Sequence, residues 1–572
     1  MAASSRKAKS RRGRSAPIEP SKLLNTTDIV PQRVLPVVDV LSLEFLTALG
    51  IAVALLLNVP WWQGGLAGLV LSLIFVVRMR GTTLPRALAA RVDYFRGRRS
   101  KTRKRSAADP FDVPLGDDAQ IGFRWDGRTL LSLLKIEENP QALTIMEPGM
   151  TVSGETVSVE LLVECLRQFD INLDSIDVIS QGARSSGHTQ IAAVYDAVLG
   201  PLPAIAQRNV WIAVRFDPSR CVEAVNHRGG GRTGILRTAT TATRRVANRL
   251  TEAGLRTRIL TAAEIAHATS QLSDGVNLTN IDETWTHCRE GNFQLRSYAL
   301  KGSALTTAGL GMMWTIPSYS TTVCVSLQNA SEEEYIKIRG LARFDSHGPG
   351  SRINLKGLAP LRGQQFNALI SSLPLPQPKR PLGHWVYGRR IEDFRELALP
   401  ASGCGQVIGA DEYGRAIALP IFGPQIARVE ISGTLHLAQQ AVLRALALGA
   451  RVLVHTRRPA MWRDMVEAVG DNHLLWVAEF DRGAMQAGSE RNYSVAVYDG
   501  STEQPVRIGI TTMIVMPPNT VPSADADVSL EQLDHDTDTV KVSTRAGSAI
   551  VTMVATDEEM RYIKASFEAQ YA

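Results

Sequence analysis

Two long apolar runs near the start of the chain dominate the pattern of hydrophobic and polar positions. They cover residues 41–57 and 61–77, and each contains 17 residues. A helix of that length measures about 25 Å at ~1.5 Å per residue, near the lower limit for crossing a bilayer. Asn58, Val59 and Pro60 separate the runs and favour a tight reversal, while Trp61 and Trp62 are typical of a membrane interface. The pattern predicts a two-helix transmembrane hairpin.

Two other interpretations of these runs are a cleaved signal peptide and a buried hairpin of a soluble protein. The signal peptide fits poorly, because a second apolar run follows directly and no small-x-small cleavage site precedes it. Neither run contains Lys, Arg or Asp, which favours the spanning hairpin over the buried one. Glu44 lies at the outer end of the first run, where its carboxylate can reach the headgroups.

Beyond the apolar runs, strand-like and helix-like segments alternate, which predicts a large mixed α/β region. Ile121, Phe123 and Trp125 alternate with polar residues, and Asp126-Gly127 predicts a hairpin turn into 129–136. Helices are predicted at 159–169, 191–199, 235–253, 437–448 and 557–571. Strands are predicted at 176–179, 210–216, 256–260, 428–431, 451–455, 474–478, 494–498, 512–516 and 549–555. The alternation in the first part suggests a partly parallel sheet covered by helices, and the polar stretch 517–540 is expected to be a solvated loop.

The stretch 371–382 contains four prolines and predicts a stiff linker between two domains. The expected organisation is a basic cytoplasmic tail (1–40), a transmembrane hairpin (41–77), a basic juxtamembrane segment (78–106), an α/β domain (107–370), the linker (371–382) and a second α/β domain (383–572).

Charge is distributed unevenly along the chain. Residues 1–39 carry a net charge of +5 and residues 78–105 a net charge of +10, whereas the whole chain carries +7. Since Glu44 is the only charge between these blocks, residues 106–572 carry −7. Positive flanks stay on the cytoplasmic side, so both termini are expected in the cytoplasm, with the basic segments against anionic lipids. The acidic body argues against a nucleic-acid binder.

Two glycine-containing motifs invite a search for nucleotide chemistry. Gly229-Gly-Gly-Arg-Thr-Gly234 fits Gly-x-Gly-x-x-Gly and has Arg228, Arg232 and Arg237 nearby, but it does not follow a strand directly, as the dinucleotide fingerprint requires. A structural glycine turn is the main interpretation, with nucleotide or anion contact as alternatives. Residues 428–440 read as strand, turn and helix, the position of a phosphate-binding loop, yet the chain has no Gly-Lys dipeptide to reach a phosphate.

Other chemistry-bearing residues give no assignable site. Asp525, Asp527, Asp534, Asp536 and Asp538 include two Asp-x-Asp pairs that could hold a metal, but they lie outside any predicted strand end. Wide spacing of the cysteines fits inert thiols in a reducing compartment; they are Cys165, Cys221, Cys288, Cys324 and Cys404. The sequence shows neither His-Glu-x-x-His nor Gly-x-Ser-x-Gly. We therefore expect no catalytic, cofactor-binding or metal-binding residue, and no enzyme.

Several segments together resemble a known family. They are Trp125-Asp-Gly-Arg128, Asp174-Ser-Ile-Asp-Val-Ile-Ser-Gln-Gly-Ala-Arg184, Val194-Tyr-Asp-Ala-Val-Leu-Gly-Pro-Leu-Pro-Ala204, Arg228-Gly-Gly-Gly231 and Leu260-Thr-Ala-Ala-Glu-Ile265. Farther along, Gly409-Ala-Asp-Glu-Tyr-Gly-Arg415 and Leu443-Arg-Ala-Leu-Ala-Leu-Gly-Ala450 are similar to longer members. The chain thus resembles the EccE membrane component of type VII (ESX) secretion systems, most specifically over residues 40–270.

This resemblance implies a non-catalytic structural subunit of an inner-membrane protein-secretion complex, without a cofactor. The implied partners are the EccB, EccC and EccD components, with the mycosin protease nearby. The alternative function is a membrane-anchored transferase that uses a sugar nucleotide and one of the Asp-x-Asp pairs.

Overall fold

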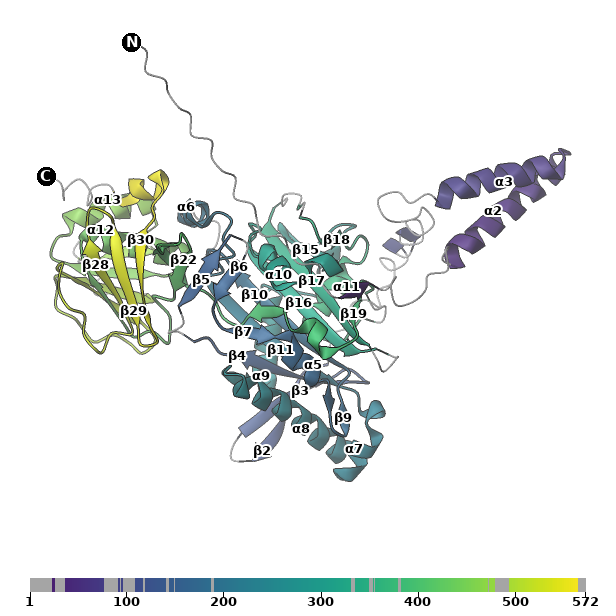
Figure 1. Cartoon of the computed structure of the whole chain (residues 1–572), viewed down its shortest axis with the longest axis horizontal. Coiled ribbons are helices and arrows are strands. Elements are labelled where there is room, and N and C mark those ends of the chain that lie inside the picture. The colour runs from purple at the N-terminus through teal and green to yellow at the C-terminus, as the bar shows by residue number, and fades with distance from the viewer. Residues whose placement is uncertain are drawn as a thin grey trace, which may run out of the picture.

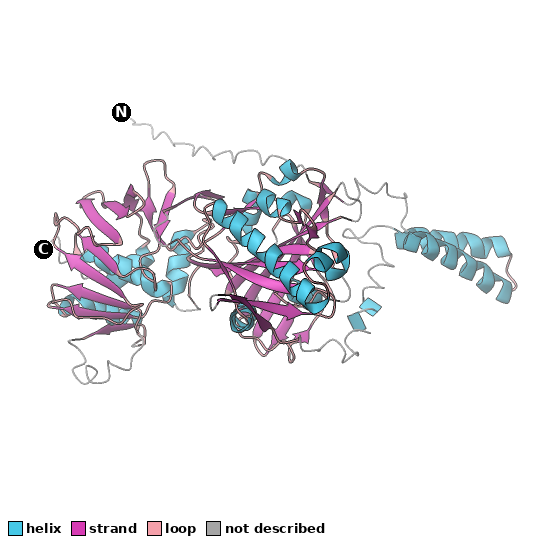
Figure 2. Cartoon of the chain, turned by 90° about the horizontal axis from the view of Figure 1, so that it is seen from below, coloured by secondary structure: helices cyan, strands magenta, loops and turns pink. Residues whose placement is uncertain are grey.

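The computed structural model describes residues 23–25, 37–76, 91–92, 94–95, 108–116, 119–139, 143–148, 150–186, 190–330, 335–348, 353, 355–378, 382–471, 473–478 and 493–563. Two strand-rich parts form the body, and a pair of helices projects from it (Figure 1). The same division is visible in Figure 2, where the paired helices stand apart from the strands of both sheets.

The projecting pair consists of α2 (Val37–Leu56) and α3 (Trp61–Val76), joined by a turn in which Asn58 has a φ of 54°. Glycines let the two backbones approach closely. A Cβ on Gly50 would lie 2.3 Å from the carbonyl oxygen of Gly64, and one on Gly68 would lie 2.6 Å from that of Leu46. The contact between the helices therefore depends on small residues.

The predicted membrane-anchored fold with a transmembrane hairpin is wrong. Among the residues that the structure describes, no helix is both long enough and apolar enough to span a bilayer. α3 has 16 residues and measures about 24 Å at ~1.5 Å per residue, against a hydrocarbon core of ~30 Å. In α2 the uncharged run begins only after Glu44 and ends with the helix at Leu56.

The first sheet has the strand order β13-β14-β15-β17-β16-β10-β11-β4-β3-β2. Its bounds are β2 Phe111–Gly116, β3 Ala119–Trp125, β4 Leu130–Ile136, β10 Ser175–Ala183, β11 Gln207–Phe216, β13 Asp282–Glu283, β14 Cys288–Glu290, β15 Phe293–Leu300, β16 Ser320–Asn329 and β17 Ile336–His347. At its margins β12 (Thr257–Ile259) pairs with β4, β18 (Leu358–Pro360) with β15, and β19 (Val386–Gly388) with β17 and with β1 (Leu24–Asn25). The hairpin predicted around Asp126-Gly127 is present as β3–β4.

All described pairings in this sheet are antiparallel, so the expected partly parallel arrangement is wrong here. The cause is α6 (Gln190–Leu199), which connects β10 to β11. A crossover helix would cover the sheet that it connects, but α6 packs against the second sheet, and β11 returns beside β10 in the opposite direction.

Helices cover both faces of the first sheet. One face packs against α5 (Val159–Glu164), α8 (Gly231–Glu252) and α10 (Thr307–Met313). The other packs against α9 (Ala262–Leu272) and α11 (Gln365–Ser371). In α8 the buried residues Thr238, Ala242, Val246 and Leu250 recur every four positions, which sets a single apolar stripe toward the sheet.

The second sheet has the order β25-β24-β26-β27-β23-β28-β29-β30-β21-β22-β5-β6. Parallel pairings join β23 (Arg428–Ser432), β24 (Val452–Thr456), β25 (Leu475–Val477), β26 (Val495–Asp499), β27 (Thr511–Met516) and β28 (Val528–Asp534). The antiparallel part contains β29 (Thr539–Thr544), β30 (Ser548–Met553), β21 (Gln406–Ala410) and β22 (Ala416–Leu419). Among the helices that pack on this sheet are α12 (Leu435–Ala447), buried along its whole length, and α13 (Ala460–Val469).

The two sheets exchange segments. β5 (Thr144–Glu147) and β6 (Met150–Ser153) come from the first half of the chain but extend the second sheet through β22. The Tyr195 hydroxyl of α6 accepts the N–H of Val407 at 2.9 Å. The two halves of the chain also meet in a separate two-stranded sheet, in which β20 (Ala398–Pro400) pairs with β7 (Thr156–Ser158). The domain boundary at 371–382 stays a prediction.

The stretch 517–540 is not a continuous loop, because it contains β28. Val528, Leu530 and Gln532 alternate as buried residues along this strand. The aspartates on both sides of the strand conceal that short alternation in the sequence.

A buried ion pair fixes the helical residues 557–563 to α12. Arg444 Nε donates to Glu559 Oε1 at 2.6 Å, and both side chains are 1–2% exposed. Arg444 also donates to the carbonyl oxygens of Val407 and Ile408. Its guanidinium therefore joins three segments of the second sheet unit.

Replacing Glu559 by Leu should lower the free energy of unfolding by about 3–5 kcal/mol, because Arg444 would remain buried without its carboxylate. The double variant Arg444→Met/Glu559→Leu should lose clearly less. Denaturant unfolding measures both, with Arg395→Met, at an exposed pair with Glu160, as a control that costs at most ~1 kcal/mol. Equal losses in the single and double variants would contradict the pairing argument.

Candidate functional site

In α/β sheets the carboxyl ends of the parallel strands usually border the ligand crevice. Here the protein's own side chains fill the turn between β23 and α12. Gln532 Oε1 accepts the N–H of Thr434 at 2.9 Å, and Thr434 Oγ1 accepts the N–H of Leu437 at 3.3 Å. A Cβ on Gly433 would lie 2.8 Å from Gln532 Oε1. The helix N-terminus that a phosphate would bind is thus capped by a glutamine and a threonine.

The neighbouring strand ends are filled in the same way. The Asp499 carboxylate at the end of β26 accepts hydrogen bonds from Arg458 Nη2 at 2.6 Å, Thr456 Oγ1 at 2.8 Å and Trp462 Nε1 at 3.0 Å. These bonds hold the pKa of Asp499 below its usual value, although burial alone would raise it. The aspartate acts as a structural anchor for α13.

The glycine motif at 229–234 forms the corner between α7 (Val222–His227) and α8. Gly229, Gly230 and Gly231 have φ values of 104°, 63° and 52°, a backbone that favours glycine. A Cβ on Gly234 would lie 2.3 Å from the carbonyl oxygen of Val225, so this glycine permits the two helices to touch. Arg228 pairs with Asp170 at 2.6 Å. Each of these features has a structural role in the corner.

The two Asp-x-Asp pairs lie at opposite ends of β28. Asp525 and Asp527 precede the strand, whereas Asp536 and Asp538 lie in the turn that follows it. Seven residues of strand separate the pairs by about 23 Å at ~3.3 Å per residue. Asp527 accepts the N–H groups of Ala427 and Arg428 at 2.8 and 3.1 Å and pairs with Arg545. Within the described ranges, no group of three His, Cys, Asp or Glu side chains is placed to hold a metal.

These positions lead to a stability prediction that separates a capping role from a metal site. Asp527→Ala should cost about 1–3 kcal/mol, because two backbone donors lose a charged acceptor, while Asp525→Ala at an exposed position should stay within about ±0.5 kcal/mol. Thermal unfolding with and without manganese measures both. Manganese stabilisation of the wild type that disappears equally in both variants would instead indicate a metal site.

All five cysteines are buried free thiols. Burial raises the pKa of Cys165 and Cys404 to about 11 and that of Cys324 to about 12. These three thiols are therefore protonated at neutral pH and poor nucleophiles.

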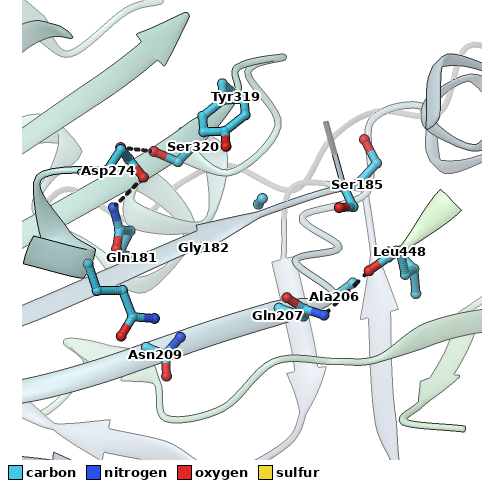
Figure 3. Close-up of a pocket in the computed structure, with 13 residues that line it drawn as sticks. Gln181, Gly182, Ser185, Ala206, Gln207, Asn209, Asp274, Tyr319, Ser320 and Leu448 are labelled. Atoms are coloured by element: carbon cyan, nitrogen blue, oxygen red, sulfur yellow. Dashed lines mark hydrogen bonds between the residues drawn. The ribbon is translucent and has the colours of Figure 1, made fainter. Parts of the chain in front are cut away.

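A polar pocket of about 210 Å³ lies where the two sheets meet (Figure 3). Side chains from β10, β11, α9 and β16 form its wall, together with Leu448 after α12. Amide and hydroxyl groups predominate among them; they are Gln181, Gln207, Asn209, Gln271, Ser185 and Ser320. The pocket can offer hydrogen bonds to a polar group, and it is small compared with the ~300–1,000 Å³ of typical small-molecule sites.

Asp274 links this pocket to a buried cluster of charges. Its carboxylate accepts hydrogen bonds from Ser320 Oγ at 2.7 Å and from Gln181 Nε2 at 3.2 Å (Figure 3). Ser320 Oγ also lies 3.0 Å from Asp345 Oδ2. Arg343 Nε bonds Asp345 at 2.9 Å, and Arg343 Nη2 lies 3.7 Å from Asp274. Two carboxylates thus share one guanidinium and one hydroxyl.

Burial raises the pKa of Asp345 well above its ordinary value, and the adjacent Asp274 raises it further, although Arg343 opposes both. The cluster therefore favours the protonated form of Asp345. None of these four residues was predicted from the sequence. The sequence signal that could have found the cluster is the spacing of Arg343 and Asp345. Two positions apart on a strand, their side chains lie on the same face of the sheet.

The cluster predicts a pH-dependent stability. A raised folded pKa means that the contribution of Asp345 is fully present below its unfolded pKa of ~4 and is lost as pH rises through the folded value. Asn mimics the protonated acid, so Asp345→Asn should become increasingly more stable than wild type above pH ~4, by ~1.4 kcal/mol for each further pH unit until the folded pKa is reached. Denaturant unfolding from pH 4.5 to 9 measures the difference. Asp464→Asn, at an exposed carboxylate on α13, should show no such trend, and a parallel pH profile for Asp345→Asn and wild type would contradict the raised pKa of Asp345.

Parts of the chain that form both sheets are similar to known proteins. Residues 204–300 match the family model described as "Putative type VII ESX secretion system translocon, EccE". The ESX-2 secretion system protein EccE2 of Mycobacterium tuberculosis is 25% identical over 455 residues, which span 77% of this chain and 81% of the relative. The ESX-5 secretion system protein EccE5 of Mycobacterium marinum is 24% identical over 355 residues, which span 60% of this chain and 86% of the relative.

The chain is similar to proteins of the EccE family over this segment and over most of the relatives' length. The resemblance found in the sequence is therefore confirmed. The matched segment runs from the junction of the sheets at Ala204 through β11, α8 and α9 to the end of β15 at Leu300. It includes the pocket residues Ala206, Gln207, Asn209, Gln271 and Asp274.

Proposed function

We propose that the chain is a non-catalytic structural subunit of a type VII (ESX) secretion complex. The observation that carries this proposal is the EccE match over residues 204–300, supported by relatives named as proteins of the ESX-1, ESX-2 and ESX-5 secretion systems. The filled carboxyl edge of the second sheet agrees with it, because Gln532 and Arg458 occupy the positions where a substrate would bind. Nothing in the structure or the relatives supports the sugar-nucleotide transferase.

The finer part of the proposal concerns partners and location. The chain would assemble at the inner membrane with the EccB, EccC and EccD components, beside the mycosin protease, and its basic flanking segments would contact anionic lipids. The large number of arginines in residues 78–105 supports the lipid contact.

The junction between the two sheets offers a way to test assembly. Cys404 N–H donates to the Ile205 carbonyl oxygen at 2.9 Å, and Gly405 N–H donates to that of Ala206 at 3.1 Å. A Cβ on Gly403 would lie 2.4 Å from the Ala206 carbonyl oxygen. Gly403→Ala must therefore displace one sheet relative to the other. At Gly383 the same methyl group would meet nothing within 4 Å, which makes Gly383→Ala a matched control.

We expect Gly403→Ala to reduce co-purification of the other ESX components several-fold, because surfaces from both sheets would no longer keep their relative positions. Gly383→Ala should leave it unchanged. Affinity purification of the full chain from detergent-treated membranes, followed by quantitative mass spectrometry, measures both. Wild-type protein that purifies without any ESX component would refute the proposed function, and full assembly with Gly403→Ala would refute the role of the junction.

A further inference from the structure

Several arginines are buried on the face of the first sheet that α9 and α11 cover. Arg215 on β11 is paired across the strands with Leu131, which is also paired with Arg124 on β3. On the next strands Asp177 is paired with Ser326, which is paired with Arg339 on β17. Directly paired residues share a face of the sheet. The three arginines, with Asp177 and Ser175, therefore lie on one face of the sheet in two adjacent cross-strand rows, together called the arginine row below.

The arginine row contains more positive than negative charge. Arg215 Nε pairs with Asp177 Oδ2 at 2.9 Å, and both side chains are 1–2% exposed. Arg339 and Arg124 are buried as well, and the pKa of each is lowered by burial and by the nearby Arg215. Asp109 acts on Arg124 from an exposed position, and Asp174 is already paired with Arg220 at 3.1 Å. Three guanidinium groups thus face one fully buried carboxylate.

Unpaired hydrogen-bond donors outnumber unpaired acceptors in the described part of the row, where Asp177 Oδ1 is the buried carboxylate oxygen without a partner. Among the described residues, Arg215 Nη1 and Nη2, Arg339 Nε and Arg124 Nε have no hydrogen-bond partner although they are buried. Ser175 Oγ and Ser371 Oγ are in the same condition. Leaving a buried charged donor unpaired costs several kcal/mol. Water would satisfy these donors without cancelling the charge, whereas an anion would do both.

We infer that the arginine row binds a chloride-sized inorganic anion between Arg215 and Arg339. A halide accepts hydrogen bonds from several N–H donors at once. Because it carries no hydrogen to donate, it requires no acceptor from the protein. The fully buried side chains leave little room for a larger oxyanion. Arg339 is further held by the Trp385 ring, whose centroid lies 4.5 Å from its Cζ.

The anion would also secure the chain segment that follows α11. Arg124 Nη1 donates to the Pro374 carbonyl oxygen at 2.7 Å, and Arg339 Nη1 donates to that of Leu382 at 3.3 Å. Both ends of the proline-rich stretch are thus tied to arginines of the row. An anion that relieves the repulsion between these guanidinium groups would strengthen both bonds.

The direct test is crystallographic, on the wild-type full chain grown in sodium bromide. We expect an anomalous bromide peak within hydrogen-bonding distance of Arg215 Nη1 or Nη2. Electron density for water alone at that position, with no anomalous signal, would overturn the inference.

Solution measurements separate specific binding from a general salt effect. Melting temperatures are compared in sodium chloride, bromide and gluconate at one ionic strength, and the exchange of amides in residues 371–378 is followed by mass spectrometry. Chloride and bromide should raise the melting temperature above its value in gluconate and slow that exchange. Arg339→Met removes one of the two surplus positive charges and one side of the inferred site but keeps the Arg215–Asp177 pair, so chloride affinity should fall at least tenfold.

The matched control is Arg184→Met, at a buried arginine outside the row that donates to the carbonyl oxygens of Thr315 and Gly200. It should keep the chloride effect of the wild type. Identical halide effects in the wild type and in folded Arg339→Met would overturn the inference. If Arg339→Met does not fold, the bromide crystal of the wild type decides alone.

Discussion

The close approach of two backbones between Ala206 and Gly403 is the constraint on which the rest of the molecule depends. Cys404 and Gly405 donate backbone hydrogen bonds to Ile205 and Ala206, and the space for a side chain at position 403 does not exist. These bonds join the residues directly before β11 of the first sheet to the residues directly before β21 of the second sheet. The two sheets are therefore linked at this point. Neither sheet can shift without breaking buried polar bonds, which are costly to leave unpaired. The polar pocket next to this junction consequently has a fixed shape.

A second consequence is the way in which the first sheet carries buried charge. On the face under α9 and α11, an apolar row of Trp211, Ile179, Cys324 and Leu341 separates two polar rows. One contains the Asp274–Arg343–Asp345 cluster, with an excess of carboxylates, and the other is the arginine row. Charges in a low-dielectric interior interact strongly and must be balanced nearby. Burial and the adjacent Asp274 favour the protonated form of Asp345 in the first row, and the inferred anion would balance the second. The same sheet therefore carries one buried row with excess negative charge and one with excess positive charge, and each needs its own compensation.

The sequence predicts those parts of the fold that are determined by local pattern. Alternation and Asp126-Gly127 identify the β3–β4 hairpin, and four-residue spacing identifies α8, while the apolar parallel strands of the second sheet are found within one or two residues. Tertiary exchange is not visible locally: nothing in α6 or in β5 and β6 announces that they belong to the second sheet. Strands that carry buried arginines, such as β17, escape a search for apolar runs, and the site escapes with them. The wrong transmembrane prediction arose because the apolar runs 41–57 and 61–77 were measured from the sequence alone. The helices end earlier, at Leu56 and Val76, and this shortens the apolar length of each.

The second sheet shows how an α/β fold can be adapted to a static role. Its parallel strands end at a crevice that would normally receive a ligand, but Gln532 caps α12, and Asp499 is saturated by Arg458, Thr456 and Trp462. The open space lies at the other edge instead. A cavity of about 440 Å³ there is bordered by Lys135 and Glu138 from the first half of the chain and by Gly405 and Pro424 from the second. Since that cavity exists only while both halves are in contact, a group bound in it would sense the junction itself. The shape of this cavity therefore depends on the integrity of the junction.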